Sequence, residues 1–177
     1  MKNIVYLATS IDGYIADIDG GIDWLSTVPN LTNDDLGWGE FISKIDALVM
    51  GKNTFLKVLS FGVEWPYPVP TFIVSNSMQQ VPEGYEDKVE IMSGSPQEIT
   101  VLLNNKGYEN LYIDGGSTIQ QFLQADLVDE LIITKIPLIL GKGIPLFTEF
   151  SKQLVFEHVK TEVLIGELVQ TAYRRKR

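Results

Sequence analysis

Three segments of the sequence combine small polar residues with the end of an apolar run, in a pattern that suits anion binding. They are Met50–Thr54, Val74–Ser77 and Ile113–Thr118, and the first and last should each open a helix. Glycine lets another group approach the backbone closely, and a helix N-terminus offers free N–H groups with about half a positive charge. Two such helix starts beside a hydroxyl-rich strand end predict a cradle for a phosphorylated cofactor.

Each of these segments also has a plainer interpretation. Gly115 and Gly116 would suit a tight strand-to-helix turn, and Lys52 would suit an ordinary surface position beside a helix cap. The sequence contains neither the Walker motif Gly-x-x-x-x-Gly-Lys-Ser/Thr nor a Gly-x-Gly-x-x-Gly fingerprint. A bound nucleotide would therefore be held in some other way.

The elements that position these segments follow from the apolar spacing. Strands are expected over residues 2–10, 47–50, 71–74, 89–92, 110–113 and 130–138. Helices are expected over about 34–44, with Asn33 as the N-cap, from residue 51 onward, over 96–104 and over 117–124. The chain should end in an antiparallel pair of strands over 154–163 and 168–175. This order predicts an α/β fold, with a mixed, mainly parallel sheet flanked by helices and a C-terminal antiparallel hairpin. We expect one domain over residues 1–177, and ligands in such sheets bind beyond the carboxyl ends of the parallel strands.

Composition narrows the classes of function. The net charge of −9 argues against nucleic-acid binding, because a phosphate backbone requires a basic face. The sequence has no cysteine, which excludes disulfides and thiolate metal sites, and no metal site is expected. No apolar run approaches the roughly 20 residues of a membrane span, and Ile4–Ala8 does not resemble a signal peptide, so we expect a cytoplasmic protein. The one histidine, His158, lies in an alternating stretch that indicates a surface strand.

The placement of arginine is more informative than the net charge. All three arginines, Arg174, Arg175 and Arg177, lie in the last four residues. An anion bound by the rest of the chain must therefore be held by lysine, hydroxyl groups, backbone N–H groups or helix N-termini.

The sequence as a whole resembles the dihydrofolate-reductase-like superfamily, and within it the riboflavin-pathway branch, which comprises the reductase domain of the bifunctional riboflavin biosynthesis deaminase-reductase and its stand-alone relatives. The resemblance spans almost the whole chain in order, but no deaminase zinc motif is present. The segments that carry it are Ala8–Ala16 (ATSIDGYIA), Gly21–Trp24 (GIDW), Ala47–Thr54 (ALVMGKNT), Ile73–Ser75 (IVS), Tyr112–Gly116 (YIDGG) and Asp129–Thr134 (DELIIT).

This resemblance implies NADPH as the hydride donor. It places Gly51, Lys52 and Thr54 at the adenosine phosphates, Ser75 and Asn76 near the adenine and the 2′-phosphate, Gly115, Gly116, Ser117 and Thr118 at the pyrophosphate, and Ala8, Ile15 and Ala16 against the nicotinamide. It also implies a cis peptide bond between Gly115 and Gly116, which would mark a functional constraint.

Reduction of a C=N or C=O bond also requires a proton. The resemblance makes Asp35 the first candidate for the acid and Asp23 the second. Their plainer interpretations are a first-turn helix residue for Asp35 and a loop residue for Asp23. Trp24 and Trp38 are expected to be walls of the substrate pocket or core aromatics.

The substrate implied by the resemblance is 5-amino-6-(5-phosphoribosylamino)uracil. The missing arginine clamp argues against dihydrofolate, although another pterin or pyrimidine stays open, and Lys57, Lys142 or Lys152 could hold a substrate phosphate. A non-catalytic nucleotide-binding module is the alternative from another class, and a flavin protein is a weaker one. An apolar segment at 138–147 makes a homodimer plausible.

Overall fold

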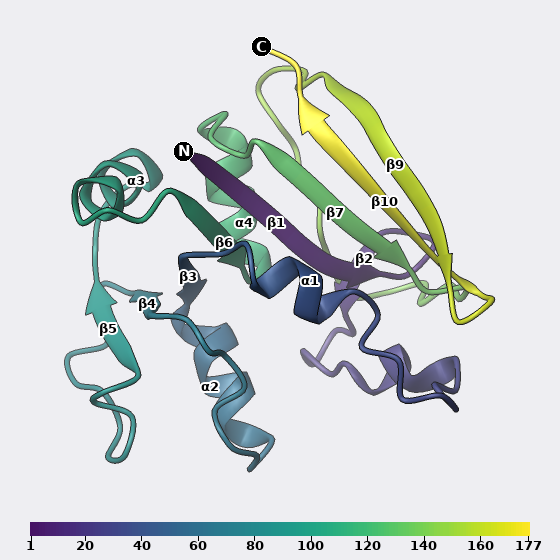
Figure 1. Ribbon diagram of the computed structural model, residues 1–177, viewed down its shortest axis with the longest axis horizontal. Helices are drawn as coiled ribbons and strands as arrows, with labels where there is room; N and C mark the ends of the chain where they lie inside the picture. Colours follow the sequence, from purple (N-terminus) through teal and green to yellow (C-terminus); the bar gives the residue numbers. More distant parts are fainter.

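The computed structural model describes all 177 residues, and its centre is an eight-stranded sheet in the order β5-β4-β3-β6-β1-β7-β10-β9 (Figure 1). The strands are β1 (Lys2–Thr9), β3 (Ala47–Gly51), β4 (Thr71–Val74), β5 (Val89–Met92), β6 (Asn110–Asp114), β7 (Glu130–Lys135), β9 (Phe156–Leu164) and β10 (Leu168–Arg175). The first six in this list run parallel to one another, and β10 is antiparallel to both β7 and β9. The predicted mainly parallel sheet and C-terminal hairpin are confirmed.

Helices cover both faces of the parallel part. They are η1 (Asp23–Thr27), α1 (Trp38–Ile42), α2 (Lys52–Ser60), α3 (Pro96–Asn105) and α4 (Gly116–Gln124). Alternate residues of β3 bury against different layers, since Leu48 packs with residues of α1 and α2, whereas Val49 packs with residues of α3 and α4. None of these helices is long and apolar enough to cross a membrane.

The predicted helix over 34–44 is wrong at its N-terminal end. Only Trp38–Ile42 is helical, because Leu36 and Gly37 both adopt positive φ, 56° and 83°. A non-glycine residue rarely adopts that conformation, and two in succession end any right-handed helix. Asn33, the predicted N-cap, also has a positive φ of 51° and lies four residues before the observed cap.

The sequence did not predict a small second sheet. The expected loop over 11–25 contains β2 (Tyr14–Ala16), which pairs antiparallel with β8 (Ile144–Pro145) from the late loop. The strand predicted over 130–138 ends at Lys135, close to Pro137, which has no N–H for the ladder. The shortened strand frees the following loop to fold back onto β2.

Two of the arginines at the end of the chain, Arg175 and Arg177, bind the turn before β7, and the third, Arg174, pairs with β9. The Arg175 guanidinium binds both carboxylate oxygens of Asp126, at 2.7 and 3.1 Å. Arg177 donates to Asp129 at 2.6 Å, and Arg174 lies 3.5 Å from Glu157. All three arginines therefore serve the fold, and none of them lines the main cleft.

Candidate functional site

The largest cleft lies where the parallel strands end. Its volume is about 990 Å³, and it opens over the carboxyl ends of β1, β3, β4 and β6. Ile15–Ile22 and Leu25 of η1 contribute to one wall, and α2 and the start of α4 contribute to the others. The structure thus brings the three predicted polar segments together at one edge of the sheet.

The first turns of α2 and α4 meet at the floor of this cleft through two reciprocal contacts. A Cβ added to Gly51 would lie 2.9 Å from the Thr118 hydroxyl oxygen, and one added to Gly115 would collide with the Thr54 hydroxyl. Each helix therefore presses a threonine against the glycine that caps the other. This close approach explains why both caps are glycine.

Both helix starts keep their backbone donors free of side-chain partners. Gly51 and Gly115 are the N-caps of α2 and α4, and being glycines they offer no side chain to cap the first turn. The first N–H groups of a helix have no partner within it, and the aligned peptide dipoles add positive potential there. Two such ends side by side form a site suited to a pyrophosphate group.

A hydroxyl cluster lies at the end of β4, next to the start of α2. The Lys52 ammonium donates to Ser77 Oγ at 3.3 Å, and the Ser75 and Ser77 hydroxyls are 3.5 Å apart. Ser75 and Ser77 line the cleft, whereas Asn76 is exposed and does not. The backbone turns after Ser75 and brings Ser77 back beside it, so Ser77 joins Ser75 at the cleft.

The apolar wall comes from the start of the chain. Ala8, Ile15 and Ala16 line the cleft, as do Ile144 and Gly116. A Cβ on Gly116 would lie 2.6 Å from Ile15 Cδ1, so β2 packs directly on the first turn of α4. These residues could form a flat apolar face for a planar ring.

An ionisable group that sequence reasoning missed lies in the same cleft. Asp114 ends β6, and its Oδ1 accepts the Gly115 N–H at 2.8 Å. Burial raises the pKa of Asp114 to about 6, and the hydrogen bond from Gly115 only partly opposes that rise. The motif Asp-Gly-Gly looks like a turn in the sequence, and no spacing signal marks its aspartate as partly buried.

Three tyrosines share this cleft, and two of them, Tyr67 and Tyr112, lie near the Asp114 carboxyl group. Tyr6, Tyr67 and Tyr112 line the cleft with Asp114, and burial raises the pKa of all three. The negative charge of Asp114 raises the pKa of Tyr67 and Tyr112 further. Trp38 does not line the cleft, but its ring lies 5.9 Å from Tyr6 and 6.1 Å from both Tyr67 and Tyr112. The predicted wall residue therefore supports the wall from behind.

The two predicted acids lie outside the cleft lining. The Asp35 carboxylate accepts the backbone N–H groups of Gly37 at 2.9 Å and Gly39 at 3.0 Å, and these bonds lower its pKa. Asp34 similarly accepts the Leu36 N–H at 2.7 Å. Asp23 is exposed at the start of η1. In this structure Asp35 is a capping residue for α1.

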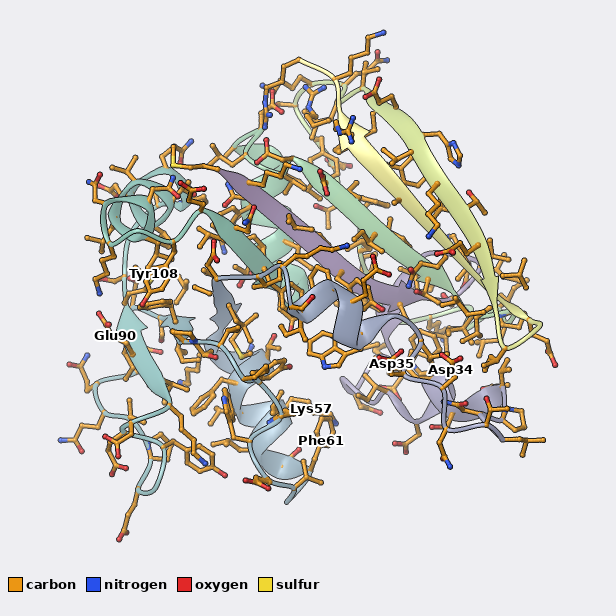
Figure 2. All side chains as sticks on the ribbon, viewed as in Figure 1. Asp34, Asp35, Lys57, Phe61, Glu90 and Tyr108 are labelled. Carbon is orange, nitrogen blue, oxygen red and sulfur yellow. The ribbon has the colours of Figure 1, made fainter.

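Of the three lysines considered for a substrate phosphate, Lys57 lines the cleft. It lies on α2, four residues before Phe61 at the C-cap of that helix, with its ammonium 5.8 Å from the Phe61 ring centre, and both residues line the cleft (Figure 2). Figure 2 shows Asp34 and Asp35 in the segment before α1. Lys142 and Lys152 do not line the cleft, and Lys152 is paired with Asp126.

Two further predictions were tested locally. The structure contains no cis peptide bond, so the expected cis bond between Gly115 and Gly116 is wrong. Gly115 makes the turn with φ 89° and ψ 133°, a conformation open to glycine, so the chain turns with a trans bond. Trp24 packs against Val28 and Ile136 and does not itself line the cleft.

Comparison with known proteins places this site in a family. The sequence profile of the RibD C-terminal domain matches residues 2–169. The chain is 33% identical to the uncharacterised protein YwjB of Bacillus subtilis, over 98% of each chain. A crystal structure from Shewanella sp. PV-4, provisionally described as a riboflavin biosynthesis protein, is 52% identical and superposes with a TM-score of 0.97 over 100% of both chains.

Two more distant structures show the same fold. One is the diaminohydroxyphosphoribosylaminopyrimidine deaminase/5-amino-6-(5-phosphoribosylamino)uracil reductase of Thermotoga maritima, 18% identical, with a TM-score of 0.75 over 99% of this chain and 56% of that one. The other is Enterococcus faecalis dihydrofolate reductase, solved with NADP(H), 22% identical, with a TM-score of 0.67 over 99% and 97%. The predicted dihydrofolate-reductase-like fold is thereby confirmed.

Proposed function

The chain belongs to the RibD C-terminal domain family, and on that premise we propose that it is an NADPH-dependent reductase of a small heterocyclic substrate. The observation that carries the proposal is the pair of uncapped helix starts, α2 and α4, packed together through Gly51 and Gly115 at the floor of a cleft. A site built in this way suits the pyrophosphate of a dinucleotide.

The surroundings of this pair suit the rest of such a cofactor. Lys52 with Ser75 and Ser77 offers one charge and two hydroxyls, which suit a 2′-phosphate. Ala8, Ile15 and Ala16 on the other side offer an apolar wall for the nicotinamide ring. The cofactor would supply the hydride, and the chain's own residues would bind it and orient it.

The remaining part of the cleft suits a planar substrate with an anionic tail. Tyr6, Tyr67 and Tyr112 provide aromatic surface next to Asp114, and Lys57 provides a positive charge at the mouth. This set favours the aminouracil ribosyl phosphate over dihydrofolate, because no arginine reaches the cleft to hold a glutamate tail. Another pterin stays as the alternative substrate class.

Asp114 is a better acid than Asp35 in this geometry. A group with a pKa of about 6 is protonated in about a tenth of molecules at pH 7, whereas an ordinary aspartate is protonated in about one in a thousand. Asp35 has a lowered pKa, and its carboxylate already accepts two backbone N–H groups. We infer that Asp114 delivers the proton to the atom next to the carbon that receives the hydride.

The experiment that tests the cofactor proposal is a titration with NADPH and with NADH, followed by the melting temperature. A ligand at a hundred times its dissociation constant adds about 2.7 kcal/mol of stability, which is readily measured. We expect a clear shift with NADPH and a smaller one with NADH. No shift with either would reject the proposal.

A matched pair of lysine variants tests the phosphate cluster. Lys52→Gln keeps most of the side-chain length but removes the charge, so it should weaken NADPH at least about tenfold and leave NADH nearly unchanged. Lys142→Gln removes an equivalent charge from an exposed loop and should change neither affinity. If Lys52→Gln lost the same affinity for NADPH and for NADH, Lys52 would not be the residue that binds the 2′-phosphate.

A second pair of variants tests which aspartate donates the proton, and the same assay tests whether the protein is catalytic at all. With the aminouracil as substrate, Asp114→Asn should lower the turnover at least about a hundredfold and keep NADPH affinity, and Asp35→Asn should keep most of the turnover. The opposite result would restore Asp35 as the acid. NADPH binding without turnover of any aminouracil or pterin would favour the nucleotide-binding module.

A further inference from the structure

The loop that follows β7 crosses over the start of the chain and contributes to the apolar wall of the cleft. This segment, residues 138–146, is called the strap below, and it contains β8, which pairs antiparallel with β2. Leu146 is fully buried and Ile144 lines the cleft, so this part of the segment considered for a homodimer contact packs on its own chain. The position of Ile144 in the wall therefore depends on what holds the strap in place.

One carboxylate binds the beginning of the strap. Asp12, in the turn between β1 and β2, accepts the Leu140 N–H at 3.1 Å and the Gly141 N–H at 2.8 Å. It also accepts the hydroxyl of Ser10, a fully buried residue, at 2.6 Å. The Ser10 hydroxyl, followed by the two backbone groups, lowers the pKa of Asp12, so this side chain is a carboxylate at neutral pH. Asp12 itself does not line the cleft, and the proposed chemistry does not use it.

The far end of the strap is held by α4 and by the same turn. The Gln120 side chain on α4 donates to the Pro145 carbonyl oxygen at 2.9 Å, and the Leu146 N–H donates to the Gly13 carbonyl oxygen at 2.9 Å. Between the two ends the strap lies so close to β2 that a Cβ added to Gly143 would collide with the Ala16 carbonyl oxygen. The strap and β2 therefore form one packed unit.

This unit rests on the first turn of α4. A Cβ added to Gly116 would lie 2.6 Å from Ile15 Cδ1 on β2 and 3.7 Å from Ile144 Cγ2 on β8. One isoleucine from each short strand thus borders the helix start that we assign to the pyrophosphate. A shift of the strap would move both side chains relative to that helix start.

We propose that Asp12 is a positioning residue for the nicotinamide end of the cofactor, because its carboxylate closes the strap on β2 and the closed strap sets Ile15 and Ile144 beside the start of α4. The inference rests on the proposed NADPH site. The adenosine end of that site, at Lys52 and Ser75, is formed by α2 and the end of β4 and does not include the strap. Asp12 should therefore affect one half of the cofactor and leave the other unchanged.

Asp12→Asn tests this division with two ligands. Three donors converge on the carboxylate, whereas asparagine offers one acceptor oxygen and an amide that is itself a donor. Apparent affinity falls with the fraction of molecules in the binding-competent state, so a strap closed in about a tenth of molecules weakens NADPH about tenfold. Adenosine 2′,5′-bisphosphate, which lacks the nicotinamide half, should bind the variant as tightly as the wild type. Isothermal titration calorimetry measures both affinities.

Asp46→Asn is the matched control. The Asp46 carboxylate also accepts two backbone N–H groups from a distant segment, those of Glu109 at 2.9 Å and Asn110 at 2.7 Å, but it does so at the other end of the parallel strands. It should change the affinity for neither ligand. A purely structural contribution of such a carboxylate would give the same result at Asp12 as at Asp46.

Gly143→Ala displaces the strap without altering Asp12. The added Cβ would collide with β2, so this variant should show the same selective loss of NADPH affinity, and it decides the question if Asp12→Asn does not fold. Combining the two substitutions should add little further loss, because both act through the same contact.

The pair of ligands separates failure of this inference from failure of the proposed function. A wild type that binds neither ligand would reject the cofactor site, and the inference with it. Wild-type NADPH affinity in both variants, or an equal loss for the two ligands, would overturn the role of Asp12 alone and leave the cofactor site standing.

Discussion

Three helices begin at the same edge of the sheet, and they complete their first turns in different ways. At α3, Ser95 accepts the Glu98 N–H and Glu98 accepts the Ser95 N–H at 2.8 Å, a complete capping box. At α2 and α4 the caps are Gly51 and Gly115, and no side chain serves the free N–H groups. The chain therefore forgoes a cap at the two helices that border the floor of the cleft.

This difference separates a structural helix start from one kept for a ligand. A side-chain cap contributes about 1 kcal/mol, which neither α2 nor α4 gains. Both helices instead gain a close mutual approach, with Thr54 against Gly115 and Thr118 against Gly51. If the uncapped ends are a binding site, changes there should reduce cofactor affinity, whereas changes at α3 should affect stability alone.

The largest effect is expected from Gly115→Ala. The new Cβ would collide with the Thr54 hydroxyl, and φ at this position is 89°. Left-handed backbone costs roughly 1–2 kcal/mol and overpacking roughly 1–3 kcal/mol more, so we expect a loss of about 3 kcal/mol and of measurable NADPH binding. Urea denaturation and NADPH titration measure the two effects.

Gly107→Ala is the matched control for this substitution. Gly107 also has a positive φ, 96°, but its added Cβ would meet nothing within 4 Å. It should therefore show only the backbone cost and bind NADPH normally. If both variants bound equally well, the contact between the two helix starts would have no role in the site.

A pair of carboxylates provides the next comparison. Hydrogen bonds from Ser95 lower the pKa of Glu98 at α3, whereas burial raises the pKa of Asp114 before α4 from 3.8 to about 6. Below pH 4 Asp114 is protonated in both the folded and unfolded states. Between pH 4 and 6 the unfolded state loses the proton first, so the folded state becomes relatively less stable as the pH rises.

Asp114→Asn should remove this penalty. A rise of about two units corresponds to roughly 3 kcal/mol, so the variant should gain up to that amount over the wild type by pH 7. The gain should vanish as the pH falls from 6 to 4, which thermal melts across that range would measure. A constant difference between the two proteins at all pH values would mean that Asp114 titrates normally.

Gly51→Asp would convert an open helix start into a capped one. Gly51 has φ −79° and ψ 159°, a cap conformation that aspartate adopts without strain, although its Cβ would approach Thr118. The new carboxylate would occupy the N–H groups and repel a phosphate, so NADPH affinity should fall at least about tenfold. Gly51→Ala, which adds the Cβ without the charge, isolates the steric part, and an equal loss in both variants would assign the effect to crowding.

The sequence predicted these open helix starts because each pairs glycine with the end of an apolar strand. Gly51, Lys52, Thr54, Ser75 and Gly115 all line the cleft. Short motifs at strand ends can predict a shared site, because the carboxyl ends of parallel strands lie at the same edge of the sheet.

The acids were harder to predict, because their roles depend on tertiary surroundings. Asp35 has the expected position along the chain, but positive φ at Leu36 and Gly37 turns its carboxylate onto the start of α1. Asp114 has no distinguishing neighbour in the sequence, and its pKa is raised by burial, which arises only when the tertiary structure forms. Pairings between distant short strands, such as β2 with β8, likewise have no local signal.

The smallest effect is expected at the closed helix start, from Ser95→Ala. Removing the hydroxyl that accepts the Glu98 N–H should cost about 1 kcal/mol, or roughly 2–4 °C in melting temperature for a chain of this size. Because α3 satisfies its own first turn, NADPH affinity should stay the same even though neighbouring Pro96 borders the cleft. A melting curve and an NADPH titration on the same sample measure both quantities. A parallel loss of affinity would show that α3 also contributes to the site, and the division between closed and open helix starts would then fail.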